Sequence, residues 1–157
     1  MRIGFGYDVH PLVEGRELWL GGVHIEHPLG LMGHSDADVL IHAICDALFG
    51  AANLRDIGSN FPDSDDMYKN YESQYFLRQA MNMVRMAGYQ LENIDATVVA
   101  EQPRLSPYVP EMKKTLAELM RVPVSAISLK ATTTEKLGFT GRGEGIAAYA
   151  VTLLKNN

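Results

Sequence analysis

Apolar and non-apolar residues alternate through the first segment of the chain, and this period of two predicts a β-strand at 2–10. One face of the strand would be apolar, and the other would carry small residues followed by two possible metal ligands. The two sets are Ile3, Phe5, Tyr7 and Val9 against Gly4, Gly6, Asp8 and His10. Two glycines leave the second face bare, so we expect another element to approach it. Pro11 lacks a backbone donor and is expected to end the pairing.

Periodic spacing elsewhere predicts three helices and several shorter strands. Ser35-Asp36-Ala37-Asp38 has the Ser-x-x-acid form of a helix start, and Gly50 is expected to end the helix that follows. Gly21-Gly22 is typical of a hairpin turn between two short strands. The predicted elements are helices at 39–49, 72–87 and 110–120, and strands at 17–20, 23–25, 95–100, 127–133 and 146–154.

The strand predicted at 146–154 is apolar at nearly every position, whereas a strand buried on one face alternates. We therefore expect both of its faces to be covered, and an oligomer interface would cover the second one. The whole pattern predicts an α+β fold, with about three helices packed on one face of a mixed β-sheet. No linker or repeat interrupts the pattern, so residues 1–157 are expected to form a single domain.

Composition narrows the class of protein. The 157 residues are 46% hydrophobic and 21% charged, which is ordinary for a globular domain and excludes a disordered or collagen-like chain. Lys and Arg number 14 against 19 Asp and Glu, a net charge of −5 that argues against nucleic acid as a general partner. No apolar run approaches about 20 residues, so we expect no contact with a membrane. Cys45 is the single cysteine and no leader pattern opens the chain, which favours a cytoplasmic location.

The first candidate for chemistry is a metal site. Asp8 and His10 project from the same face of their strand, and His42 lies on a helix face with Asp38 and Asp46. Two imidazoles and a carboxylate suit Zn²⁺ with a fourth position left open. Asp38 or Asp46 could orient His42 from behind. The alternative is a solvated strand end and an exposed polar helix face.

Three further segments could bind phosphate or hydroxyl groups. The polar loop 56–65 could contact both, or it could be an Asx-rich surface turn. The segment 131–136 offers threonine hydroxyls and Glu135, a ligand type suited to Mg²⁺, but it could also be a Thr-rich strand end. The glycine-rich segment 138–145 with Arg142 could cradle an anion or form a flexible hairpin, and its pattern is not that of a Walker loop.

Taken together, these segments make the chain resemble the 2-C-methyl-D-erythritol 2,4-cyclodiphosphate synthase family. The matching motifs occur in the family's order: Gly6-Tyr7-Asp8-Val9-His10, Gly33-His34-Ser35-Asp36-Ala37-Asp38, Asp56-Ile57-Gly58, Phe61-Pro62-Asp63 and Thr132-Thr133-Thr134-Glu135-Lys136-Leu137-Gly138-Phe139. The resemblance implies a homotrimer with each active site shared by adjacent subunits. It also implies a substrate, 4-diphosphocytidyl-2-C-methyl-D-erythritol 2-phosphate, whose 2-phosphate attacks the distal phosphorus of the cytidine diphosphate arm. CMP leaves and a cyclic diphosphate forms, a step of the non-mevalonate route to isoprenoids.

The resemblance further implies a role for each matched residue. The implied metal ligands are Asp8, His10 and His42 for Zn²⁺, and Glu135 for Mg²⁺ or Mn²⁺. His34 and Thr133 would stabilise the transition state, and Ser35 would contact phosphate beside His34. The other implied substrate contacts are Asp8, Val9 and His10 near the first metal; Asp56, Ile57, Gly58, Phe61, Pro62, Asp63, Ser64 and Asp65 for the methylerythritol part; Ala100, Glu101, Gln102, Pro103, Arg104, Leu105 and Ser106 for cytidine; and Thr132, Thr134, Phe139 and Arg142 for the phosphates.

One position departs from the family pattern. Two other functions are alternatives to that of a cyclodiphosphate synthase. Arg104 stands where the family commonly has Lys, which keeps the positive charge but changes the shape and the donor pattern. A zinc-dependent phosphohydrolase would explain Asp8, His10 and His42 but would give no reason for the loop at 100–106. A non-catalytic trimeric protein could instead bind an isoprenoid-like ligand in an apolar central cavity.

Overall fold

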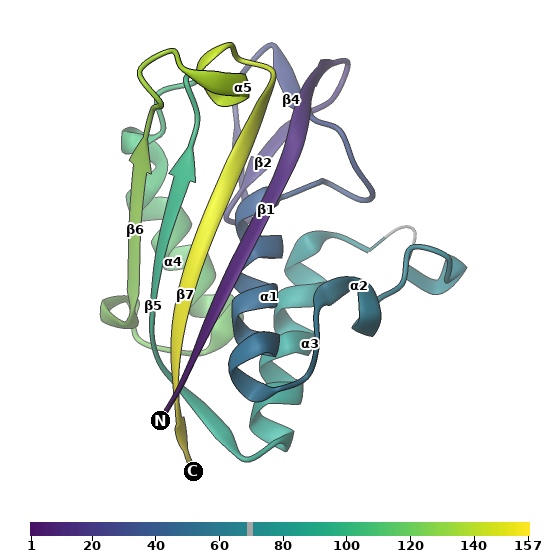
Figure 1. The fold of residues 1–157 in the computed structure, drawn as a ribbon, viewed down its shortest axis with the longest axis vertical. Coiled ribbons are helices and arrows are strands. Elements are labelled where there is room, and N and C mark those ends of the chain that lie inside the picture. The colour runs from purple at the N-terminus through teal and green to yellow at the C-terminus, as the bar shows by residue number, and fades with distance from the viewer. Residues whose placement is uncertain (69–70) are drawn as a thin grey trace.

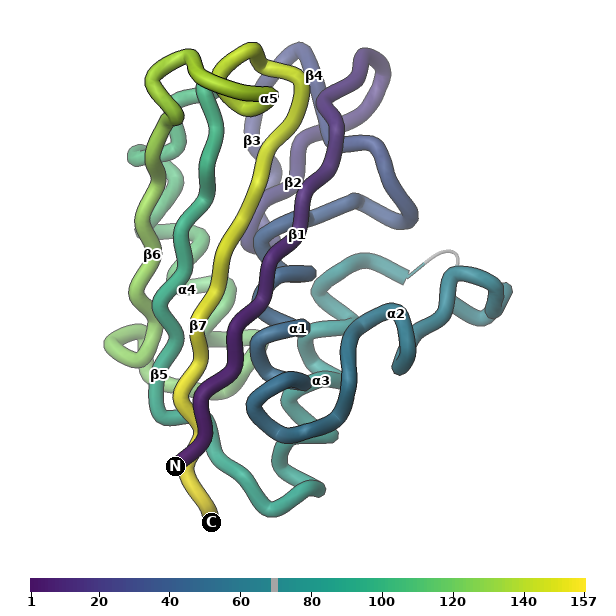
Figure 2. Tube along the Cα trace, viewed as in Figure 1, coloured from purple at the N-terminus to yellow at the C-terminus, as the bar shows by residue number. Residues whose placement is uncertain are grey.

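A five-stranded mixed sheet forms the centre of the computed structural model, which describes residues 1–68 and 71–157 (Figure 1). Its strands, in spatial order, are β4 (Leu29–Leu31), β1 (Arg2–Glu14), β7 (Gly145–Asn156), β5 (Tyr89–Val99) and β6 (Ile127–Thr132). β5 and β6 run parallel, and the other adjacent pairs are antiparallel. The start of β1 pairs with the end of β7, so the two termini lie together at one end of the sheet (Figure 2). The predicted mixed sheet is therefore confirmed.

Three long helices cover one face of this sheet: α1 (Val39–Ala52), α3 (Ser73–Met86) and α4 (Val109–Met120) (Figure 1). α1 packs against β1 and β7, α3 packs against α1, and α4 packs against β6. Nearly every side chain of α1 is buried, because this helix lies between the sheet and α3. The predicted α+β class and its three helices on one face are therefore correct.

The structure adds short elements that the sequence pattern did not predict. α2 (Ile57–Asn60) and α5 (Gly138–Gly141) have four residues each, which is too short to show a helical period. Three single 3₁₀ turns cover Asp66–Tyr68, Ser106–Tyr108 and Val124–Ala126. The predicted hairpin is present as β2 (Leu18–Leu20) and β3 (Val23–Ile25), a separate two-stranded sheet. None of the helices in the described ranges is both long enough and apolar enough to span a lipid bilayer.

One predicted strand, 95–100, begins earlier, at Tyr89, and three further predicted element ends are wrong for a local reason. Pro11 does not end β1, because the strand changes partner there from β7 to β4, and the carbonyl of Pro11 accepts a hydrogen bond from Met32. Ser35 does not cap α1; the carboxylate of Asp38 does so, accepting from the backbone N–H of Ile41. Gly50 does not end α1, which continues to Ala52 and is closed by Asn53 with a φ of 58°.

The sheet face opposite the helices carries a row of exposed apolar side chains. On β1 these are the odd-numbered positions of the alternating pattern, and Phe5 and Tyr7 lie across from Val151 and Tyr149 of β7. The exposed fractions are 61% for Phe5 and 44% for Val151. A contiguous apolar surface of this kind marks an interaction surface on a globular protein. The full set, here called the open apolar face, is Ile3, Phe5, Tyr7, Val9, Tyr149 and Val151.

Candidate functional site

The close packing of β1 on α1 creates the site. An ideal Cβ built on Gly4 would lie 1.8 Å from the carbonyl oxygen of Ala47, and one built on Gly6 would lie 1.9 Å from that of Ala43. Any side chain at these two positions would therefore push the helix away. The bare strand face predicted from the sequence is confirmed, and it lets α1 bring His42 up to β1.

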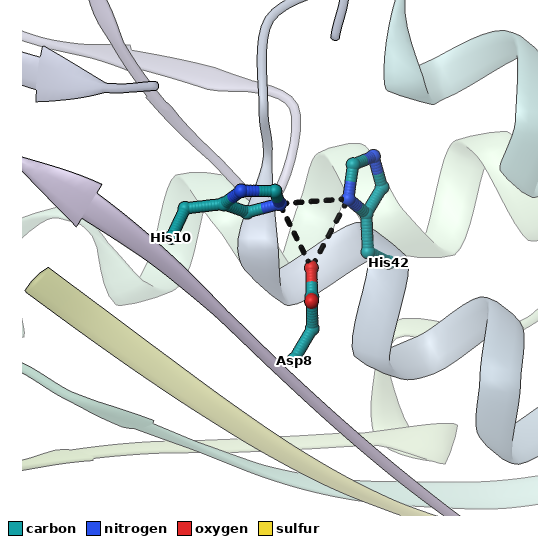
Figure 3. A group of neighbouring side chains, drawn as sticks. All are labelled: Asp8, His10 and His42. Carbon is teal, nitrogen blue, oxygen red and sulfur yellow. Dashed lines mark hydrogen bonds and ion pairs between the residues drawn. The ribbon is translucent and has the colours of Figure 1, made fainter. Parts of the chain in front are cut away.

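Asp8, His10 and His42 converge on one point (Figure 3). Oδ2 of Asp8 lies 3.0 Å from Nε2 of His10 and 3.1 Å from Nδ1 of His42. The two imidazole nitrogens are 3.2 Å apart. All three side chains are largely buried but keep some access to solvent. The predicted convergence of strand and helix side chains is confirmed.

These three residues could hold a divalent metal ion. Their ligand atoms are spaced at 3.0–3.2 Å. That spacing is close to the roughly 3.3 Å edge of a tetrahedron whose centre lies about 2.0 Å from each ligand. Within residues 1–68 and 71–157, no other group of three His, Cys, Asp or Glu side chains meets this condition.

The charges in this cluster are strongly coupled. Burial opposes ionisation of Asp8, but its contacts with His10 and His42 outweigh burial and hold the pKa of Asp8 well below its usual range. Burial would lower the pKa of His42, but the hydrogen bond and charge of Asp8 raise it. The Asp8 carboxylate is therefore ionised and lies beside two imidazole nitrogens, an arrangement that suits a cation.

The predicted partners behind His42 are wrong. Asp38 is fully buried and accepts from the backbone N–H groups of Gly21, Gly22 and Ile41, so it fixes the start of α1 to the β2–β3 turn. Asp46 accepts from the backbone N–H of Ile57 at 2.8 Å and thereby positions the loop that follows α1. Neither carboxylate makes a hydrogen bond to His42.

Ser73 and Asp36 take the place of those partners. The hydroxyl of Ser73, at the start of α3, lies 3.0 Å from Nε2 of His42. The same hydroxyl donates to the carboxylate of Asp36. Sequence reasoning missed both roles, because the contact depends on how α3 packs across α1.

A pocket opens beside the three converging side chains. Apart from Phe61, nine predicted site residues or partners line it: Asp8, His10, His34, Ser35, His42, Asp46, Ile57, Gly58 and Asp63. The remaining lining residues are Phe61, which was also predicted, and Tyr68 and Phe76, which were not. The Phe61 ring contacts both of them, with ring centroids 5.4 Å from Tyr68 and 5.0 Å from Phe76. Phe76 lies within the helix predicted at 72–87, for which the sequence analysis assigned no site residue.

The loop residues of this pocket differ in how firmly they are held. Asp56 caps α2 by accepting from the backbone N–H of Ser59 at 2.7 Å. His34 lies 3.6 Å from Asp63, and both side chains are about 70% exposed at the pocket rim. The backbone oxygen of Ser35 accepts from Arg16 at 2.5 Å. The three converging side chains are therefore largely buried, whereas His34 and Asp63 at the entrance are exposed to an incoming ligand.

The second half of the predicted site lies elsewhere in the chain. None of the predicted residues at 100–106, 132–135, 139 or 142 lines the pocket beside His42. They gather instead where β5 and β6 end, and a hydrogen bond of 3.0 Å from Ala100 N–H to the Thr132 carbonyl joins the two segments. Glu135 approaches Thr133, whose Oγ1 accepts from the Glu135 N–H at 3.2 Å. Arg142 pairs with Glu144 at 2.9 Å.

One polar atom in this second group lacks a partner. A carboxylate oxygen of Glu101 is buried and makes no hydrogen bond within the part of the chain that the structure describes. A buried acceptor without a donor is unfavourable, so something outside these residues is expected to complete it. A single chain thus presents two separate groups of predicted site residues.

The fold and the site define an α+β protein with a metal-ligand cluster of two histidines and an aspartate beside a polar pocket. The family model that matches residues 1–155 is that of the YgbB family, and the chain belongs to this family. A relative from Parabacteroides distasonis is 68% identical over 99% of this chain and 96% of its own length, and is named 2-C-methyl-D-erythritol 2,4-cyclodiphosphate synthase. The family resemblance drawn from the motifs is therefore confirmed.

Solved structures agree with this assignment. The bifunctional IspDF of Campylobacter jejuni is 45% identical with a TM-score of 0.96, and the match covers 99% of this chain but 42% of that longer one. A structure of 2C-methyl-D-erythritol-2,4-cyclodiphosphate synthase in its CDP-bound form is 40% identical with a TM-score of 0.91, and covers 98% of this chain and all of that chain.

Proposed function

We propose that this chain is an enzyme that converts 4-diphosphocytidyl-2-C-methyl-D-erythritol 2-phosphate into 2-C-methyl-D-erythritol 2,4-cyclodiphosphate and CMP. The supporting observation is the convergence of Asp8, His10 and His42 beside a pocket, in a chain 68% identical to a named synthase over nearly its whole length. The reaction is an intramolecular phosphoryl transfer in isoprenoid biosynthesis. The free, buried Cys45 fits the proposed cytoplasmic location.

The metal proposed at the three side chains is Zn²⁺. Two imidazole nitrogens and one carboxylate oxygen are ligands that zinc accepts, and the same three residues line the pocket in which a substrate would bind. Bound there, Zn²⁺ would supply Lewis-acid polarisation of a phosphate oxygen and a fixed point for aligning the substrate. Glu135 is proposed to hold Mg²⁺ or Mn²⁺ together with substrate phosphates, since these hard cations often take one protein carboxylate.

The residues of the pocket are proposed to position phosphate rather than to remove a proton. The attacking phosphate is already an anion, so the reaction needs no strong general base. His34 and Ser35, at the pocket rim, would contact phosphate oxygens, and Thr133 would do so from the second group. The Asp56–Asp65 segment would hold the methylerythritol hydroxyls. The catalytic task of the protein is to bring two anionic arms together and align them.

A homotrimer would unite the two groups of predicted site residues. The open apolar face needs a partner, and the metal-ligand cluster and the β5–β6 loop group are separate within one chain. In a ring of subunits, the pocket of one chain would meet the Ala100–Ser106 and Thr132–Glu135 segments of the next. The buried oxygen of Glu101 would then gain a donor from the neighbouring subunit or from the cytidine part of the substrate.

The test is product analysis with the cytidylyl substrate. Purified protein, loaded with zinc and supplied with Mg²⁺, should release CMP and a cyclic diphosphate in equal amounts, as followed by ³¹P NMR. An open-chain phosphate product would support a zinc-dependent phosphohydrolase, and binding without any product would support a non-catalytic isoprenoid-binding protein. His42→Ala should lose both zinc and turnover, and wild-type turnover in this variant would refute the assigned centre.

A further inference from the structure

The side of His42 that faces away from the cluster is fully occupied. Its Nδ1 points to Asp8 and His10, and its Nε2 lies 3.0 Å from the hydroxyl oxygen of Ser73. Ser73 has no exposed surface, so water does not compete for this contact. The hydroxyl therefore decides which nitrogen of His42 carries a proton.

Counting donors fixes the direction of this hydrogen bond. The Ser73 hydroxyl has one hydrogen, and it is directed at Oδ1 of Asp36. An ionised carboxylate only accepts, and Oδ2 of Asp36 also accepts from the Ser73 backbone N–H at 3.1 Å. With its hydrogen committed to Asp36, the Ser73 oxygen can only accept from His42. Nε2 of His42 therefore keeps its proton, and Nδ1 is the nitrogen that can give a lone pair to a cation.

We propose that Asp36 and Ser73 are positioning residues, which fix the tautomer and ring orientation of His42 for metal binding. The inference rests on the metal site of the proposed function, but not on the reaction catalysed there. A histidine ligand commonly gives its second N–H to such a partner, and losing that partner weakens metal binding. Here two residues act in series, called the Asp36–Ser73 arm: the Asp36 carboxylate orients the buried Ser73 hydroxyl, and this hydroxyl orients the His42 ring.

Asp36 also reaches the segment proposed to contact phosphate. Its Oδ1 accepts from the Asp38 backbone N–H at 3.2 Å and from the Ser35 hydroxyl at 3.4 Å. One carboxylate thus joins the start of α3, the start of α1 and the pocket rim. A change at this residue should therefore affect metal affinity more than a change at Ser73.

The test measures the zinc affinity of the zinc-loaded protein by competition with a chromophoric chelator. Ser73→Ala should weaken zinc binding by about 10- to 100-fold. Asp36→Asn should weaken it further, because the amide N–H₂ would face either the Ser73 backbone N–H or the three donors from which Oδ1 now accepts, and a neutral amide oxygen accepts more weakly than a carboxylate. Gln74→Ala is the matched control: Gln74 anchors the same turn of α3 through the Gly22 carbonyl at 3.1 Å, and this variant should keep wild-type affinity.

A second measurement observes the His42 proton directly. In ¹⁵N-labelled, zinc-loaded wild-type protein, the His42 Nε2–H should give a slowly exchanging signal, which Ser73→Ala should lose and Gln74→Ala should keep. Wild-type zinc affinity in Ser73→Ala and Asp36→Asn, or rapid exchange of this proton in the wild type, would overturn the proposal. Because neither readout involves turnover, a protein that passes both tests yet makes no cyclic product would refute only the proposed function.

Discussion

Replacing Gly6 by alanine tests whether close packing of β1 on α1 builds the metal site. The added Cβ would lie 1.9 Å from the carbonyl oxygen of Ala43 and 2.7 Å from the amide nitrogen of Ala47. Both neighbours are backbone atoms, so rotation of a side chain cannot relieve the contact. The helix would have to move away from the strand by about 1 Å to reach an acceptable contact distance.

A shift of that size is large for both stability and metal binding. Overpacking of a core contact costs roughly 1–3 kcal/mol, and a backbone clash should fall at the upper end. The 3.1 Å separation between Asp8 and His42 is set by the same approach of helix to strand. Metal sites accept ligand distances within about 0.2 Å of their preferred values, so a shift of about 1 Å should reduce zinc affinity by at least tenfold.

The assay combines urea unfolding of the zinc-free chain with chelator competition for zinc. Gly50→Ala is the control on the other side of this contact, in α1. Its Cβ would meet nothing closer than the Phe5 carbonyl oxygen at 4.0 Å. That variant should gain about 0.5–1 kcal/mol from helix propensity and keep its zinc affinity. If Gly6→Ala matched the wild type in stability and in zinc affinity, the packing argument would be refuted.

Three further outcomes follow from the structure. Burial raises the pKa of Asp38 to about 6, so this carboxyl stabilises the folded chain at low pH, and that contribution is lost as the pH rises through 6. In chelator-treated protein, the unfolding free energy of the wild type should therefore fall relative to that of Asp38→Asn between pH 4 and 7. A constant difference between the two proteins would contradict this. Phe5→Glu should dissociate the proposed trimer in analytical ultracentrifugation, whereas Met86→Glu on α3, also an exposed apolar position, should leave the mass unchanged. Gly33→Ala would place a Cβ 2.9 Å from Cε1 of His10 and should weaken zinc binding by about tenfold, with unchanged affinity speaking against this contact.

The sequence pattern indicated that Asp8, His10 and His42 could meet, and the family resemblance implied that they do, which the structure confirms. Period-two alternation put the first two on one strand face, and the bare glycines predicted that an element would pack there. The helical spacing around His42 supplied that element. These are short-range patterns, and each can be recognised from the spacing of neighbouring residues in the sequence.

The contacts of Asp36 and Ser73 with His42 correspond to no such sequence pattern. Ser73 is 31 positions from His42 along the chain, and their contact exists because α3 crosses α1 at one particular place. The Ser35-x-x-Asp38 pattern also misled the prediction of the helix start, because Asp38 caps the helix itself while Asp36 is used across the interface. Side-chain roles of this kind depend on tertiary packing, which residue periodicity does not encode.

Electrostatics gives a reason why a metal ion at the cluster would favour binding of the proposed substrate. The chain carries a net charge of −5, and the proposed substrate carries several phosphate charges of the same sign. Without a metal ion, the negative charge of Asp8 is balanced at most by protonation of His42, whose pKa it raises, so the cluster offers no excess positive charge to a phosphate. A divalent ion on the same three side chains would reverse the local sign without changing the overall charge pattern of the surface. The residues that set the geometry of the cluster, from Gly6 on the strand to Ser73 behind the His42 ring, should therefore also affect the proposed binding of phosphate in the pocket.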